Sequence, residues 1–177
     1  MWRYGKTNGT RPWQDHVEFT DRDVISAISK LKSNLSAGPD GLPPLLFKRL
    51  KICLARPLAL VFTQLFSVGA IPPEWKKAII TPIYKKGIAT DVSNYRPISL
   101  TCVASKLMER IIATKIYNHL YEHNLLCNTQ HGFLRGRSTC TNLLEAMNDW
   151  TLVVQSKHAV TIAYVDFSRA FDSVSHE

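Results

Sequence analysis

The stretch that decides how this chain is interpreted lies near its C-terminal end and reads Val160-Thr-Ile-Ala-Tyr-Val-Asp166-Phe-Ser-Arg-Ala-Phe171-Asp172. Residues 160–165 are apolar, β-branched or aromatic and carry no charge, which predicts a strand buried on both faces. Asp166 follows at the end of this strand, where α/β sheets present ligands. A carboxylate there suits a hard divalent cation such as magnesium, which takes oxygen ligands and shares them with phosphates.

The same aspartate has a second interpretation. An Asp after a strand is often a helix N-cap, here for the free amides near Arg169, and the stretch by itself favours that role. Asp172 does not restore the metal hypothesis, because six positions along a helix correspond to a rotation of roughly 240° and the two carboxylates would not share a face. A second acidic ligand would have to come from elsewhere.

Composition narrows the function classes. A chain of 177 residues with 45% hydrophobic content predicts one domain with a sizeable core. A net charge of +8 favours an anionic partner. The four cysteines are far apart without a Cys-x-x-Cys pair, which indicates reduced thiols in an intracellular protein. The start of the chain lacks an apolar leader, and its apolar runs are far shorter than the ~20 residues of a membrane span.

The first half predicts helices separated by turn chemistry. Residues 1–19 show no period and are interpreted as a connecting arm. Thr20 and Asp23 form a capping-box pattern ahead of an amphipathic helix predicted over 21–34. Turn residues and prolines then divide the next segment into a turn over 36–41 and helices over 45–54 and from Pro57 to near Gly69.

The middle of the chain predicts a long β-hairpin with a basic tip. Residues 78–84 and 95–101 are β-rich, and two prolines place both strands at an edge. The hairpin carries Lys85, Lys86 and Arg96, which suit a clamp for phosphates. The residues alone equally fit solvated lysines that protect an edge strand from aggregation.

A long helix with a wide apolar stripe is predicted over 103–123. Lys106 and Arg110 lie one turn apart on its polar face, where solvation is favoured over contact with a nucleic-acid backbone. In the next segment two glycines turn the backbone while Phe133, Arg135 and Arg137 project, and arginines beside an aromatic suit single-stranded nucleic acid. A last helix, roughly 140–155, is expected to pack through Leu143, Leu144, Met147, Trp150 and Val154.

Charge is concentrated in this middle region. Residues 75–137 hold ten Lys or Arg against three Asp or Glu. A basic region ahead of a strand-end aspartate is what phosphoryl transfer on nucleic acid requires, since cations hold the phosphates and a carboxylate holds magnesium.

Five motifs together resemble, in order, those of reverse transcriptases of non-long-terminal-repeat retrotransposons. The resemblance covers residues 20–177. The motifs are Ser36-Ala-Gly-Pro-Asp-Gly-Leu-Pro43, Ile83-Tyr-Lys-Lys-Gly87, Asn94-Tyr-Arg-Pro-Ile-Ser-Leu100, Gln130-His-Gly-Phe-Leu-Arg-Gly-Arg-Ser-Thr139 and Tyr164-Val-Asp-Phe-Ser-Arg-Ala-Phe-Asp172.

The resemblance implies an α+β fold of the right-hand polymerase type. Helical fingers with the basic hairpin would occupy about 20–158, and the start of the palm, with its first strand, about 159–177. The implied activity is RNA-directed DNA polymerisation, which adds deoxynucleotides to a primer 3′-hydroxyl. The implied partners are an RNA template, a DNA primer and deoxynucleoside triphosphates.

The resemblance also implies roles for single residues. Asp166 matches the first metal-binding aspartate, with the backbone carbonyl of Phe167 as a further Mg²⁺ ligand, and Phe171 matches the bulky gate that rejects a 2′-hydroxyl. Lys85, Lys86 and Arg96 match cations that hold the incoming triphosphate. Gln130, Phe133, Arg135 and Arg137, and more weakly the Gly38 to Gly41 turn, match segments that meet the template.

One departure limits the resemblance. In relatives a glycine-rich motif, a hairpin with two adjacent aspartates and a thumb follow, and adjacent aspartates occur nowhere in this sequence. Two-metal chemistry needs ions ~3.5–4 Å apart held between at least two carboxylates. We therefore expect a truncated domain that is inactive by itself. The alternative is a non-catalytic remnant that binds RNA or DNA through its basic face.

Overall fold

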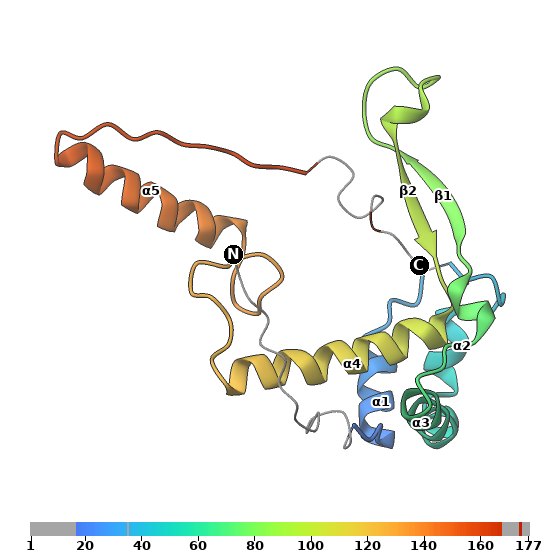
Figure 1. Cartoon of the computed structure of the whole chain (residues 1–177). Coiled ribbons are helices and arrows are strands. Elements are labelled where there is room, and N and C mark those ends of the chain that lie inside the picture. Colours follow the sequence, from blue (N-terminus) through green and yellow to red (C-terminus); the bar gives the residue numbers. More distant parts are fainter. Residues whose placement is uncertain (1–16, 35, 168–173, 175–177) are drawn as a thin grey trace. The chain divides into compact units, whose positions relative to one another are not determined.

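The computed structural model describes residues 17–34, 36–167 and 174 (Figure 1). Most of the predicted connector, and Phe171, lie outside these residues. The chain divides into two compact units, residues 1–122 and residues 123–177. Helices combine with a small antiparallel sheet, which confirms the predicted mixture of helix and strand.

The first helix, α1 (Asp21–Ser29), begins at the predicted capping box. The Thr20 hydroxyl accepts a hydrogen bond from the Asp23 amide at 3.2 Å, and the Asp23 carboxylate accepts one from the Thr20 amide at 3.0 Å. The helix ends earlier than the predicted 21–34 span. Its end is closed by a turn in which the Leu31 amide donates to Ile28, and this turn places Leu31 in the core.

Two further helices, α2 (Pro44–Arg49) and α3 (Lys51–Ser67), meet at Leu50. The prediction that Pro57 begins a helix was wrong, because Pro57 lies inside α3. A proline there has no amide hydrogen to donate to the Cys53 carbonyl, one turn earlier. The helix persists because its apolar face is buried, with Phe62 fully covered.

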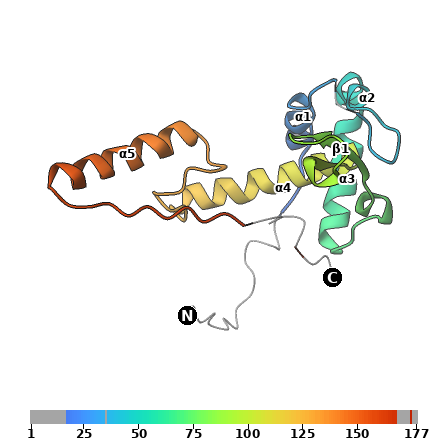
Figure 2. The ribbon, with the colours of Figure 1, turned by 90° about the horizontal axis from the view of Figure 1, so that it is seen from above.

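The core of the first unit lies between α1, α3 and α4 (Val103–Glu122). Figure 2 shows α1 and α3 beside the N-terminal half of α4. Phe62 stands edge-on to Phe19 and to Trp75, with ring centroids 5.8 and 6.1 Å apart. Full burial of each large apolar side chain stabilises the fold by about 1.5–3 kcal/mol. The predicted stripe of α4 is confirmed at Val103, Leu107 and Ile111, which are all buried.

The predicted hairpin is confirmed. Strands β1 (Ile79–Tyr84) and β2 (Tyr95–Leu100) pair antiparallel, with Pro82 opposite Pro97. A short 3₁₀ helix precedes each strand, η1 (Pro73–Lys76) before β1 and η2 (Val92–Asn94) before β2. The Lys85 amide donates to the Asn94 carbonyl at 2.8 Å. By alternation, positions 82 and 97 face away from the partner strand, so the two prolines remove no ladder bond and blunt both outer edges.

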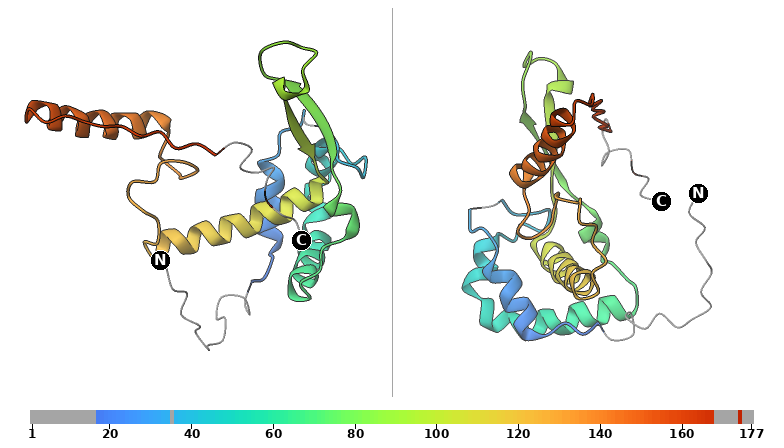
Figure 3. Two further views of the ribbon diagram at one scale, coloured as in Figure 1. Left: turned by 45° about the horizontal axis from the view of Figure 1, so that its top comes forward. Right: turned by 90° about the vertical axis from the view of Figure 1, so that its left-hand side faces the viewer.

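The second unit contains α5 (Thr139–Gln155), capped by Ser138. Two predictions here were wrong. The apolar residues of α5 do not pack, since Leu144 and Val154 are more than half exposed and none of its residues is buried. Residues 160–165 form no strand and run as mostly exposed chain after α5 (Figure 3). A strand needs a neighbour for its backbone hydrogen bonds, and within the described residues only β1 and β2 pair.

All four cysteines are free thiols, as expected. Among the described residues no helix is both long and apolar enough to cross a membrane.

Candidate nucleic-acid interface

The hairpin places two of the predicted phosphate-binding cations on one face. Ile83 pairs with Arg96, and Lys85 continues the register opposite Asn94. Side chains alternate between faces, so Lys85 and Arg96 occupy diagonal positions on the same face, where such neighbours lie about 7–8 Å apart and their Cβ atoms somewhat closer. Such a spacing lets an ammonium and a guanidinium contact oxygens of one phosphate or of neighbouring phosphates.

The loop that carries Lys86 is internally hydrogen-bonded. Asn94 Nδ2 donates to the Ile88 carbonyl at 2.9 Å, and the Tyr95 hydroxyl donates to the Ala89 carbonyl at 2.8 Å. Gly87 has φ of +94°, and a Cβ there would lie 2.7 Å from the Asn94 side chain. The basic tip is therefore held by its own loop and needs a glycine at position 87.

Cations exceed acids at this tip. Lys85, Lys86 and Arg96 are exposed and take part in none of the ion pairs between described residues. Asp91 is the acid of the loop, and hydrogen bonds from Ser93 lower the pKa of its carboxyl. These charges make the tip an electropositive projection that attracts phosphates at long range.

The Gly38 to Gly41 turn lies against the junction between β2 and α4. A Cβ on Gly38 would stand 2.5 Å from the Thr101 carbonyl oxygen, so only glycine allows this approach. Asp40 lies near the buried Cys102, and burial followed by the Asp40 charge raises the pKa of that thiol. The glycine at position 38 is therefore explained by close packing of the turn, and contact with a nucleic-acid template is not needed to explain it.

The second predicted nucleic-acid segment, 130–139, is anchored to α5 by a buried histidine. His131 Nδ1 lies 2.9 Å from Thr141 Oγ1, and His131 Nε2 lies 2.7 Å from Glu145 Oε2. Thr141 and Glu145 are one helical turn apart, so their side chains reach the same ring. The sequence reasoning missed His131, and the only signal for it was the four-residue spacing of its two partners.

The anchored loop exposes the aromatic side chain of Phe133, whereas the side chain of Arg137 hydrogen-bonds to the backbone of the same segment. Phe133 is 89% exposed at φ of +61°. Arg137, which was expected to project, donates through Nη1 to the carbonyl oxygens of Asn128 and Gln130 and so ties the loop to itself. Arg135 is exposed beside them, and the Gln130 amide reaches the Gly132 carbonyl at 3.4 Å. Phe133 is the most exposed of the large apolar side chains of the described residues.

Asp166 and Phe167 follow α5 on exposed chain, and Phe171 lies outside the described residues. Within residues 17–34, 36–167 and 174, no three His, Cys, Asp or Glu side chains gather as metal ligands. A single exposed carboxylate does not fit a two-ion centre.

The predicted site residues fall into two sets. Lys85, Lys86 and Arg96 belong to the first unit, whereas the 130–139 loop and Asp166 belong to the second. Within the first set the hairpin register brings Lys85 and Arg96 together, and within the second the loop gathers Gln130, Phe133 and Arg137.

The motifs that supply both sets lie inside one family match. The reverse transcriptase (RNA-dependent DNA polymerase) family matches residues 83–177, which is more than half of the chain. The chain belongs to the reverse transcriptase family. The predicted resemblance to retrotransposon reverse transcriptases is thereby confirmed.

Relatives extend this likeness to most of the chain. It is 31% identical over 156 residues to the probable RNA-directed DNA polymerase from transposon BS of Drosophila melanogaster, and 32% identical over 158 residues to the RNA-directed DNA polymerase from mobile element jockey of the same species. It is 29% identical over 157 residues to a Pol polyprotein of the type-1 retrotransposable element R2 of Nasonia vitripennis.

These matches cover 88%, 89% and 87% of this chain but 17%, 17% and 14% of the relatives. The chain therefore corresponds to part of a reverse transcriptase domain.

Proposed function

We propose that this chain provides the fingers region and the start of the palm of a right-hand RNA-directed DNA polymerase, where it binds template, primer and the triphosphate of an incoming deoxynucleotide. The observation that carries the proposal is the hairpin face on which Lys85 and Arg96 lie together, with Lys86 next to Lys85 in the chain. Two cations on a preorganised hairpin bind phosphate oxygens at less entropic cost than two flexible surface lysines.

The second part of the proposal concerns the 130–139 loop. Phe133 offers an exposed ring on which a base can stack, and Arg135 adds a positive charge beside it. Arg137 and Gln130 act as positioning residues, because their contacts hold the loop that presents Phe133. This division of roles refines the expectation that all four residues contact nucleic acid.

The catalytic part of the proposal rests on the family. Asp166, with the Phe167 carbonyl, would be a ligand for Mg²⁺, and Phe171 would check the sugar. This part requires carboxylates beyond Asp166, because one aspartate cannot hold two ions. The chain by itself is therefore expected to bind nucleic acid and not to polymerise.

A non-catalytic RNA-binding or DNA-binding role is the second candidate. It is supported by the exposed basic hairpin, which needs no metal centre to attract phosphates. Primer extension on an RNA template, with magnesium and deoxynucleotides, separates the candidates. Robust incorporation that is lost in Asp166→Ala would contradict the expected inactivity of the isolated chain.

Binding of a fluorescent single-stranded RNA, measured by anisotropy, tests the hairpin. Lys85→Gln/Arg96→Gln is expected to raise the dissociation constant about tenfold at moderate salt, as when charge-assisted contacts are lost. Arg22→Gln/Lys32→Gln removes the same charges from other exposed positions of the first unit and is the matched control. Equal affinities of the two double variants would refute the proposed role of the hairpin.

A further inference from the structure

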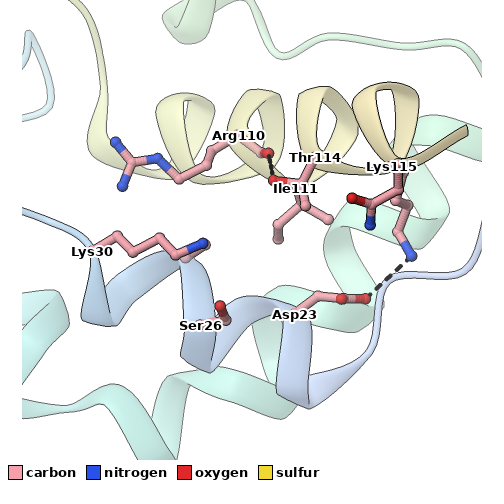
Figure 4. Close-up of a pocket in the computed structure, with 9 residues that line it drawn as sticks. Asp23, Ser26, Lys30, Arg110, Ile111, Thr114 and Lys115 are labelled. Carbon is pink, nitrogen blue, oxygen red and sulfur yellow. Dashed lines mark hydrogen bonds and ion pairs between the residues drawn. The ribbon is translucent and has the colours of Figure 1, made fainter. Parts of the chain in front are cut away.

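A cavity of about 130 Å³ opens between α1 and α4, and none of the residues that line it belongs to the hairpin (Figure 4). Ala27 and Ile111 line it and are buried. One water needs roughly 10–15 Å³ of such space, so the cavity holds a group several times larger than a water. Its polar walls consist of Asp23, Ser26, Lys30, Arg110, Thr114, Lys115 and Asn118.

The donors in this cavity exceed what the protein itself uses. Ser26, Lys30, Arg110 and Asn118 have side-chain donors that make no hydrogen bond or ion pair with any described residue. Figure 4 shows Lys30 and Arg110 on facing helices, on the side of the cavity away from Asp23 and Lys115, with side chains that run in opposite directions. A ligand that only accepts hydrogen bonds and carries negative charge suits the two cations among them, Lys30 and Arg110.

The one acid in the cavity does not oppose an anion. Burial favours a higher pKa for Asp23, but the Thr20 hydrogen bonds and the Lys115 ammonium together hold it below its ordinary value. Its carboxylate lies 3.3 Å from Lys115 Nζ, at the end of the cavity away from Arg110. Asp23 and Lys115 neutralise each other, and the charges of Lys30 and Arg110 remain.

We propose that this cavity is a phosphate-binding site that takes a backbone phosphodiester of bound nucleic acid. Lys30 supplies a point charge, and Arg110 supplies a planar fork that matches two phosphate oxygens. Pockets for drug-sized ligands measure about 300–1,000 Å³, so a whole nucleotide does not fit, and its sugar and base stay outside. The inference rests on the proposed function and adds a second phosphate contact on the first unit, beyond the hairpin.

RNA-binding measurements on the full chain test the site. Lys30→Gln/Arg110→Gln is expected to raise the dissociation constant for single-stranded RNA about tenfold and to reduce the slope of log K against log salt by about 0.7, the value for one phosphate. Both side chains are exposed, so the variant is expected to melt at the wild-type temperature. Arg22→Gln/Lys32→Gln is again the control, and equal affinity and slope in the two double variants would overturn the proposal.

A phosphate titration followed by amide NMR separates the sources of the anion and the two proposals. Inorganic phosphate is expected to shift the signals of Lys30 and Thr114 in the wild type and not in Lys30→Gln/Arg110→Gln. Phosphate shifts without any effect of this variant on RNA affinity would mean that the site takes free anions, which overturns the backbone assignment. If Lys85→Gln/Arg96→Gln leaves RNA affinity unchanged while the cavity variant weakens it, the hairpin role fails and the cavity site stands.

Discussion

Gly38→Ala is the substitution for which the structure predicts the sharpest effect. A Cβ at position 38 would lie 2.5 Å from the carbonyl oxygen of Thr101, 2.6 Å from its carbonyl carbon and 2.7 Å from the Cys102 amide nitrogen. All three atoms belong to the backbone, so no side-chain rotation relieves the contact. The turn or the start of α4 must move by about an ångström to restore ordinary van der Waals contact at 3.4 Å or more.

That movement acts on the core. Cys102 and Val103 are almost completely buried, and they connect the turn to the buried stripe of α4. Overpacking of this kind costs about 1–3 kcal/mol of unfolding free energy. For a protein of this size each kcal/mol lowers the melting temperature by about 2–4 °C, so Gly38→Ala is expected to melt roughly 2–12 °C lower.

Thermal unfolding followed by circular dichroism measures the effect against two glycine controls. Gly41→Ala meets no atom within 4 Å but has φ of +68°, and it is expected to lose about 1–2 kcal/mol through the left-handed backbone. Gly132→Ala has open space and no positive φ, and it is expected to melt as the wild type does. If Gly38→Ala melts at the temperature of Gly132→Ala, the close approach of the turn to Thr101 is refuted.

Gly87→Ala forces a Cβ against Asn94 at φ of +94°. It is expected to weaken single-stranded RNA binding several-fold in an anisotropy titration, while the melting temperature falls by only a few degrees. Unchanged binding would argue against a preorganised tip. Asp23→Asn removes the carboxylate of the capping box and is expected to cost about 1 kcal/mol at pH 7 in denaturant unfolding. The folded state lowers the pKa of Asp23 below 3.8, so this stabilisation is present above pH 3.8 and is lost as the pH falls through the folded pKa. The difference in unfolding free energy between variant and wild type should therefore close in acid. A difference that widens in acid would contradict the assignment. In timed alkylation read by mass spectrometry, Cys127 is expected to react first, because it is exposed and the Thr129 hydrogen bond lowers the pKa of its thiol. Cys102 is expected to react last, because it is buried and the pKa of its thiol is raised. The reverse order would be inconsistent with the structure.

The sequence predicted those elements whose signals are local. The capping box at Thr20 and Asp23 places the start of α1, and the β-branched runs around Lys85 predict the hairpin almost to the residue. Each of these signals depends on hydrogen bonds within a few residues, or between two strands joined by one loop. Such contacts form wherever the local chain does.

The predictions that failed depended on distant partners. The apolar run 160–165 predicts a buried strand only if another strand lies beside it, and the stripe of α5 predicts a core only if another surface covers it. Proline is typical of the first turn of a helix, but Pro57 lies inside α3, where the buried apolar face of the helix overrides that preference. The anchor at His131 joins a loop to a helix ten and fourteen positions away, which no local pattern encodes.

In the proposed function, the first unit binds nucleic acid through phosphates held by the hairpin and the α1/α4 cavity. The most direct measurement is the affinity of the wild-type chain for single-stranded RNA as a function of salt concentration. At least two phosphates are expected to be neutralised, so log K should fall linearly with log salt with a slope of about −1.4 or steeper. Binding that is undetectable at low salt, or a slope near zero, would contradict the account.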